Sequence, residues 1–279
     1  SNVVRRSSAS NSVRLGVSSG TATFGWGCFW YPAVFPMRDG LRAYFEFTVP
    51  TLISGPNTGS FTFAIVDASP SINPTPTAMC GGAGEYMGYA GINGITAPLN
   101  APKLAIEFDK ISDSSRSGPA GDHAAFIYWG ESSDDLTTKN DDNIHGLGGT
   151  TGPLNPPIVS PGLIQNPIAI GTTYSVRLEI VRTHDDTSHS SNLMLKTYIS
   201  SVSPPSCPFS QWNDLSADLT AVCQFFDPAE MNYGSLTDNI TIADIGSSAA
   251  MRQVYLGFTT GQDGPSQRVV VSNFLAISR

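Results

Sequence analysis

Residues 103–129 read KLAIEFDKISDSSRSGPAGDHAAFIYW, a strand, an acidic loop and a second strand that together decide the fold. Successive side chains of a strand point to opposite faces, so Glu107 and Asp109 project together. Ile106 and Phe108 project to the other face. Two acids on one face have three interpretations, which are a bound cation, a pair of glycosidase carboxylates, and simple solvation.

Strand patterns recur on both sides of this stretch. The segments LRAYFEFTV (41–49) and TYSVRLEIVR (173–182) alternate apolar and polar residues, and SFTFAIVD (60–67) is apolar and β-branched. Two closing strands are expected at 253–260 and 268–277, joined by the turn sequence GQDGPSQ. About a dozen short strands without a sustained helical period indicate an all-β, antiparallel sandwich.

Length and composition favour one large domain. The chain has 279 residues, of which only 14% are charged, with 27 Gly and 20 Pro. Residues 1–12 are polar and basic without a period, so we predict a flexible N-terminal segment or linker. Residues 13–279 are then a single β-sandwich with long loop insertions at 131–166 and 200–245.

The charge of the chain limits its partners. A net charge of −8 argues against nucleic acid or an anionic membrane surface, because both require a basic footprint. No apolar run reaches the length of a membrane span, so we expect no membrane insertion. Neutral ligands and cations fit this composition better.

Four cysteines are present without the CxxC spacing of a zinc site. Two disulfides are the simplest interpretation and would place the chain in an oxidising compartment. Cys207 and Cys223 bracket a segment rich in Pro, Ser and Asp, so we pair them with each other and Cys28 with Cys80. The other two pairings stay open, as do four buried free thiols in a reducing compartment.

The order of several short motifs carries a resemblance. GSFTFAIVDA is followed by GGAGEYMGYAG, by KLAIEFDK with His123 sixteen positions after Glu107, and by VYLGFTTGQ and VVVSNF. This order resembles the legume-type (L-type) lectin family of the concanavalin A-like lectin and glucanase fold, from about residue 41 to the end. The resemblance implies an antiparallel jelly-roll β-sandwich with a carbohydrate-binding site.

The resemblance also implies a double metal site, with one transition ion and one calcium ion, that holds the sugar-binding loops in shape. Gly118 stands where the family has an acid shared by both ions, and Asp122 is the candidate substitute. Calcium prefers hard oxygen ligands, and a His beside carboxylates suits manganese or another divalent ion. We expect one ion, calcium, rather than the pair. The candidate ligands are Glu107, Asp109, the carbonyl of Ile111, Asp113, Asp122 and His123.

The carbohydrate-binding residues that the resemblance implies match only in part. Thr58 stands where the family has a ligand-gripping Asp, and Asp113 stands where it has an Asn. A backbone amide near Gly81, Gly82 and Gly84 would supply a further contact. The expected sugar pocket is therefore reduced.

A glycoside hydrolase is the enzymatic alternative, because the fold also hosts glucanases. A retaining glycosidase needs a second carboxyl about 5 Å from the first. In the glucanases the catalytic acid follows the nucleophile by four or five residues, and Ile111 and Ser112 occupy those positions here. No other catalytic motif is present, so we predict that the chain is not an enzyme.

The combined prediction is an extracellular carbohydrate-binding or adhesion module, secreted or on a cell surface, within a larger surface protein. Its partners would be glycans or glycoconjugates. The alternative is a structural surface or filament subunit that uses a lectin-like sandwich with a degenerate sugar site. Whether the chain forms a homo-oligomer or a larger surface assembly stays open.

Overall fold

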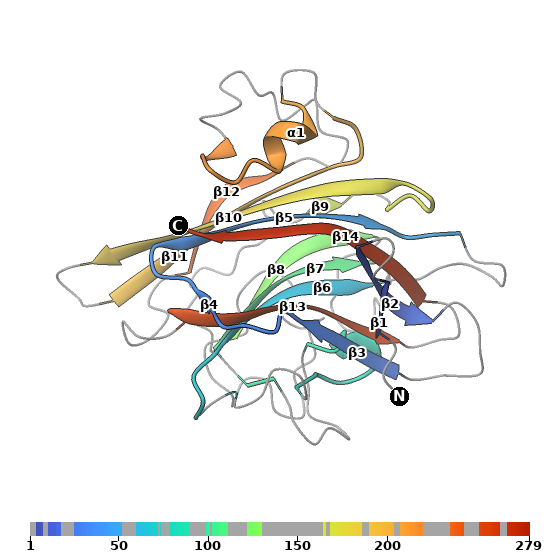
Figure 1. The fold of residues 1–279 in the computed structure, drawn as a ribbon, viewed down its shortest axis with the longest axis horizontal. Coiled ribbons are helices and arrows are strands. Elements are labelled where there is room, and N and C mark those ends of the chain that lie inside the picture. Colours follow the sequence, from blue (N-terminus) through green and yellow to red (C-terminus); the bar gives the residue numbers. More distant parts are fainter. Residues whose placement is uncertain are drawn as a thin grey trace.

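The fold is a sandwich of two seven-stranded antiparallel sheets, seen in a computed structural model (Figure 1). Sheet A has the order β3-β13-β6-β7-β8-β9, with β4 beside β13, and sheet B has the order β1-β2-β14-β5-β10-β11-β12. The predicted all-β antiparallel architecture is confirmed. The structure describes residues 4–7, 11–17, 25–51, 60–71, 73, 79–89, 99–100, 102–110, 122–129, 164–165, 168–185, 190–203, 207–219, 235–242, 251–262 and 267–279.

The strand bounds follow the alternating segments of the sequence. Sheet A contains β3 (Gly25–Trp30), β4 (Phe35–Pro36), β6 (Phe61–Asp67), β7 (Lys103–Asp109), β8 (His123–Trp129), β9 (Ile164–Gln165) and β13 (Gln253–Gln262). Sheet B contains β1 (Val4–Ser7), β2 (Ser12–Val17), β5 (Gly40–Thr48), β10 (Thr173–Asp185), β11 (Ser190–Ser200), β12 (Ser235–Ile242) and β14 (Gln267–Ser278).

The core lies between the sheets and is rich in phenylalanine. Phe45 and Phe47 of β5 face Phe61 of β6 and Phe108 of β7, and all four are at most 1% exposed. The rings of Phe61 and Phe108 stack with their centroids 4.8 Å apart. The alternation predicted for residues 41–49 is therefore confirmed, because Leu41, Ala43, Phe45 and Phe47 all enter this core.

Two predicted segments differ from the structure. Val4–Ser7, which we predicted within a flexible lead-in, forms β1 and pairs with β2. Backbone pairing needs no apolar pattern, so polar composition alone gave the wrong expectation for these residues. The region 200–245 contributes β12 to sheet B and a short helix, α1 (Phe209–Trp212). The single-domain division and the insertion at 131–166 stay predictions, since most of that insertion lies outside the described residues.

Residues 207–219, here called the cap, cover part of the outer face of sheet B (Figure 1). Trp212 and Leu219 of the cap are fully buried against Tyr44 of β5 and Tyr198 of β11. Burial of apolar area at this contact stabilises the cap on the sheet by about 25 cal/mol per Å². The cap thus makes a small core of its own on the outside of the sandwich.

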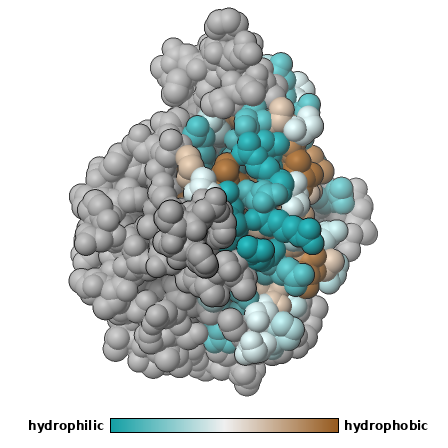
Figure 2. Space-filling view, turned by 90° about the vertical axis from the view of Figure 1, so that its left-hand side faces the viewer, coloured by the Kyte–Doolittle hydropathy of each residue, from teal (hydrophilic) through white to brown (hydrophobic). Residues whose placement is uncertain are grey.

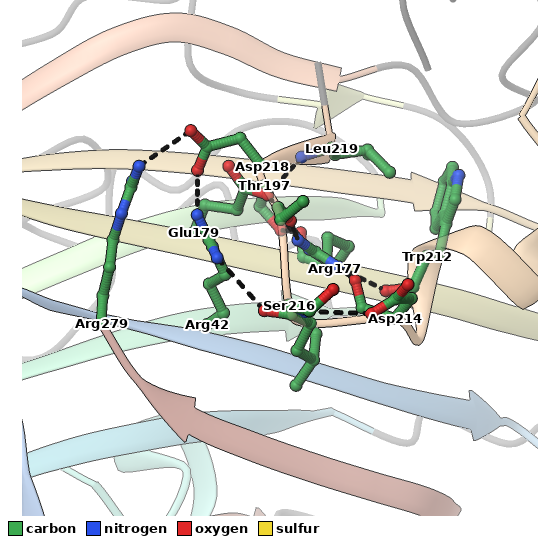
Figure 3. A network of polar contacts seen from close by, with 12 residues as sticks. Arg42, Arg177, Glu179, Thr197, Trp212, Asp214, Ser216, Asp218, Leu219 and Arg279 are labelled. Carbon is green, nitrogen blue, oxygen red and sulfur yellow. Dashed lines mark hydrogen bonds and ion pairs between the residues drawn. The ribbon is translucent and has the colours of Figure 1, made fainter. Parts of the chain in front are cut away.

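Arg177 of β10 is the polar centre of the cap (Figure 3). Its guanidinium is fully buried, pairs with Glu179 at 2.7 Å, and donates to the carbonyl oxygens of Trp212, Asp214 and Ala217 at 2.6–2.8 Å. The backbone N–H of Leu219 donates to the same Glu179 carboxylate. One buried ion pair therefore satisfies several backbone groups of the cap.

Asp218 forms the surface end of this network, where its carboxylate accepts hydrogen bonds from the guanidinium groups of Arg42 and Arg279. Burial raises the pKa of the Asp218 carboxyl, but the hydrogen bonds and charges of the two arginines outweigh burial and lower it. Because this pKa is lowered in the folded chain, the contribution of Asp218 to stability is present at neutral pH. That contribution is lost as the pH falls through the lowered pKa.

The structure also bears on the predicted disulfides and on membrane insertion. Cys28 and Cys80 are bonded, as predicted. Cys207 is also disulfide-bonded, while its predicted partner, Cys223, lies outside the described residues. Within the described part of the chain, no helix is long and apolar enough to cross a membrane.

Candidate metal and glycan site

The candidate site lies on the outer face of sheet A, where β7 ends. Glu107 is fully buried and Asp109 is 5% exposed, and both point away from the core that contains Ile106 and Phe108. The shared face that we predicted for the two acids is confirmed. Their burial excludes solvation as the reason for the pair, since bulk water does not reach either carboxylate freely.

Strand register adds a third ligand-type residue to this face. His123, the first residue of β8, lies directly opposite Asp109, and Ala125 lies opposite Glu107. Residues directly opposite in an antiparallel ladder share a face of the sheet. The backbone therefore brings the positions of Glu107, Asp109 and His123 together, although the His123 side chain lies outside the described atoms.

Ser60 also belongs to this site, although the sequence did not predict it. Its hydroxyl donates to the Asp109 carboxylate at 2.6 Å and accepts from the backbone N–H of Lys110 at 3.0 Å. Its carbonyl oxygen accepts from the Thr260 hydroxyl at 2.8 Å. The register could have revealed it, because Phe61 pairs with Phe108 and the residue before Phe61 must then adjoin Asp109.

Asp122 has a different environment from the one predicted. Its oxygen Oδ2 accepts from the Lys110 ammonium at 2.7 Å and from the backbone N–H of Ile168 at 2.6 Å. Lys110 also donates to the Ile168 carbonyl at 2.7 Å. Asp122 thus holds the chain around Ile168 to the end of β7, so its role as a metal ligand competes with an ion pair.

The glycine-rich segment forms a tight turn over the outer face of sheet A. Gly81, Gly82 and Gly84 are all buried, and Gly84 begins the short 3-10 helix η2 (Gly84–Tyr86). The Gly81 N–H donates to the carbonyl of Gly88 at 2.5 Å. A Cβ atom on Gly261 of β13 would lie 2.0 Å from the Gly84 oxygen. Close packing therefore explains Gly261, and also Gly82, where a Cβ atom would lie 2.8 Å from the Tyr86 ring. The Gly81 amide is already engaged in its backbone hydrogen bond.

A disulfide and a tryptophan anchor the start of this turn. Cys80, which precedes Gly81, is bonded to Cys28 of β3. The Trp30 indole N–H donates to the Met79 carbonyl at 2.9 Å. Both contacts come from β3, so the edge strand of sheet A fixes where the glycine turn begins.

The remaining predicted residues lie outside the described part of the chain. These are Thr58, Ile111, Asp113 and Gly118, together with Ser112 of the enzymatic alternative. Among the described side chains, no three His, Cys, Asp or Glu residues form a group that could hold an ion. The buried acids and the position of His123 would supply part of the ligand set of a cation. The other predicted ligands, Ile111 and Asp113, lie in residues 111–121, outside the described part of the chain.

Comparisons with known proteins identify the fold. No family model and no curated protein matches the sequence. Among solved structures, the lectin from Bauhinia forficata in complex with GalNAc has a TM-score of 0.51 and 12% identity, over 98% of this chain and 89% of that one. Peanut lectin with a 9mer peptide has a TM-score of 0.47 and 14% identity, over 98% and 89%. The Emp46p carbohydrate recognition domain in metal-free form has a TM-score of 0.47 and 10% identity, over 99% and 86%.

The chain therefore has the L-type lectin fold that the motif order implied. The likeness to the Bauhinia lectin spans nearly the whole chain at low identity, so it establishes the arrangement of the strands. A ligand for this chain must be argued from the residues of its own site.

Proposed function

We propose that this chain is a carbohydrate-binding module whose sugar-binding loops are organised by a divalent cation. The observation that carries the proposal is the buried pair Glu107 and Asp109 on one face of β7, with His123 opposite Asp109 in the ladder. Two carboxylates buried side by side repel each other, and a cation between them removes that repulsion. The lectin fold supports a glycan as the ligand.

Calcium is the proposed ion, because it binds six to eight hard oxygen ligands in flexible geometry. Asp109, Asp113 and the carbonyl of Ile111 are proposed to supply oxygens. Glu107 and His123 adjoin this set, and manganese, which suits mixed nitrogen and oxygen ligands, is the less favoured alternative ion for the same site. Asp122 joins the set only if Lys110 releases it.

The glycan is proposed to bind at the same end of sheet A, near Thr58, Asp113 and the turn that contains Gly81, Gly82 and Gly84. The turn is already fixed by packing and by the Cys28–Cys80 bond, which supports a preformed site. The disulfides support a secreted or luminal compartment, and we propose that the chain is part of a larger surface protein.

Calcium is expected to stabilise the chain, because it binds the folded site and not the unfolded chain. At a free concentration of about 100 times the dissociation constant, the gain is about 2.7 kcal/mol, which raises the melting temperature by several degrees. The variant Asp109→Asn should lose most of this gain. Differential scanning calorimetry with EDTA and with about 5–10 mM calcium measures it, a concentration about 5 to 100 times a dissociation constant typical of extracellular sites.

The matched control for that experiment is Asp39→Asn, an exposed acid in the turn before β5 at the opposite end of the sandwich. Equal melting temperatures with calcium and with EDTA in the wild-type chain would sink the metal site. An equal calcium response in Asp109→Asn would show that the ion binds elsewhere.

A glycan array tests the ligand directly. We expect binding to a restricted set of glycans in calcium and at least tenfold weaker binding with EDTA, because the ion holds the loops that contact the sugar. Binding that is unchanged by EDTA would separate the sugar site from the metal. Absence of binding in both conditions, from a chain shown to be folded, would contradict the lectin function.

A structural surface or filament subunit is the second candidate function. The observation that favours it is the ion pair between Lys110 and Asp122, in which a positive side chain already neutralises a predicted metal ligand. In such a subunit the sandwich would be retained without a sugar site. The array and the calcium titration together distinguish the two functions.

A further inference from the structure

A pocket opens at the end of the sandwich opposite to the candidate metal and glycan site. Its volume is about 560 Å³, within the range of small-molecule sites. It lies where β6 ends and β13 begins, since Asp67 pairs with Val254 there, whereas Asp109 lies at the other end of the sheet. The lining residues are Pro36, Arg38, Asp67, Ser69, Pro70, Arg252 and Gln253.

Two exposed arginines give this pocket its chemistry. Arg38 lies in the turn between β4 and β5, and Arg252 directly precedes β13. The chain has only 15 Lys and Arg against 23 Asp and Glu, so two guanidinium groups on one pocket stand out against its overall charge. A planar guanidinium with several N–H donors matches the oxygens of a carboxylate or a sulfate.

Among the described residues of the lining, Asp67 is the one carboxylate, and backbone N–H groups of the pocket wall already bind it. Asp67 is 5% exposed and accepts the backbone N–H groups of Ser69 at 2.7 Å and Met251 at 2.6 Å, one on each oxygen. Arg38 and Arg252 are both exposed to solvent. An anion that enters the pocket therefore meets the N–H donors of the arginines first. The charge of the Asp67 carboxylate is partly offset by its two backbone hydrogen bonds.

Backbone hydrogen bonds fix the shape of the pocket. The Met37 N–H donates to the Arg252 carbonyl at 2.7 Å, and the Ala68 N–H donates to the Gln253 carbonyl at 2.8 Å. The Arg182 guanidinium of β10 donates to the Met251 carbonyl at 3.0 Å, which joins sheet B to this wall. A preformed pocket loses little conformational entropy when a ligand binds.

We propose that this pocket is a second ligand site, which takes a sugar that carries a carboxylate or sulfate group. Arg38 and Arg252 bind the oxyanion, while Ser69 and Gln253 supply hydrogen-bonding groups for sugar hydroxyls. Pro36 and Pro70 present apolar surface to the ring. Figure 2 views the molecule from the side where β13 begins, and over the coloured part of that face it shows hydrophilic side chains gathered in a band with hydrophobic ones beside them.

Isothermal titration of the folded chain with four probes tests the site, at constant ionic strength and with EDTA to exclude the cation site. The probes are glucuronic acid, N-acetylglucosamine 6-sulfate, neutral glucose and inorganic sulfate. We expect the acidic sugars to bind at least tenfold more tightly than glucose, because only the acidic sugars offer an oxyanion to the guanidinium groups. Whichever acidic sugar binds more tightly identifies the preferred oxyanion.

Two variants locate the binding. Arg252→Gln and Arg38→Gln should each weaken acidic-sugar binding about tenfold, because each removes one charged donor. Arg14→Gln, an exposed arginine of β2 outside the pocket, should leave it unchanged. Calcium-dependent stabilisation retained in Arg38→Gln and Arg252→Gln would show that they are folded and that this site is independent of the other.

Three results would overturn the proposal. If glucose binds as tightly as the acidic sugars, the carboxylate or sulfate group does not contribute to binding. An equal loss in Arg14→Gln would indicate attraction by overall charge only. Inorganic sulfate that binds as tightly as the sulfated sugar would show that the pocket recognises the ion without the sugar.

Discussion

Replacement of Arg177 by Met is expected to lower the free energy of unfolding by about 3–5 kcal/mol, because it leaves a buried charge without its partner. Arg177 is fully buried, and its loss isolates the Glu179 carboxylate beneath the cap. The carbonyl oxygens of Trp212, Asp214 and Ala217 lose their donor in the same step. A folded chain is stable by only about 5–15 kcal/mol, so the effect is a large share of the total.

Urea unfolding followed by circular dichroism measures this loss. The control is Arg14→Met, an exposed arginine in β2 of the same sheet, for which a change within about 0.5 kcal/mol is expected. The double variant Arg177→Met with Glu179→Leu should recover part of the stability, since no buried charge then remains. A loss below about 1 kcal/mol in Arg177→Met would contradict the central role of this ion pair.

The cap also shows what the sequence could not predict. In TYSVRLEIVR, Arg177 and Glu179 occupy the polar positions of an alternating strand, which normally face water. In the structure a segment some 30 to 40 residues further along the chain covers them. Local alternation reports which face of a strand meets the core, but it carries no information on what covers the other face.

The candidate site was predictable where it depends on strand geometry. The shared face of Glu107 and Asp109 follows from the period of a strand, and the structure confirms it. The place of His123 opposite Asp109 depends on the length of the loop from 110 to 122, which no local rule fixes. The ion pair of Lys110 with Asp122 was not predicted, because it depends on where Ile168 packs.

Removal of the Cys28–Cys80 disulfide is expected to cost about 4 kcal/mol, since the bond spans 52 residues and the unfolded chain gains that loop entropy. Cys80 directly precedes Gly81, so the bond also fixes the glycine turn against β3. The variant Cys28→Ala with Cys80→Ala should therefore lose stability in urea unfolding and weaken glycan binding as well.

The two effects of this variant can be separated. Calcium is proposed to bind at the end of β7, whereas the disulfide fixes the glycine turn, so calcium should still stabilise the variant. If the turn contacts the glycan, affinity should fall several-fold even at temperatures where the variant is fully folded. Unchanged affinity in a folded variant would show that the turn contributes to stability and does not contact the sugar. The sugar would then bind near Asp113 and Thr58.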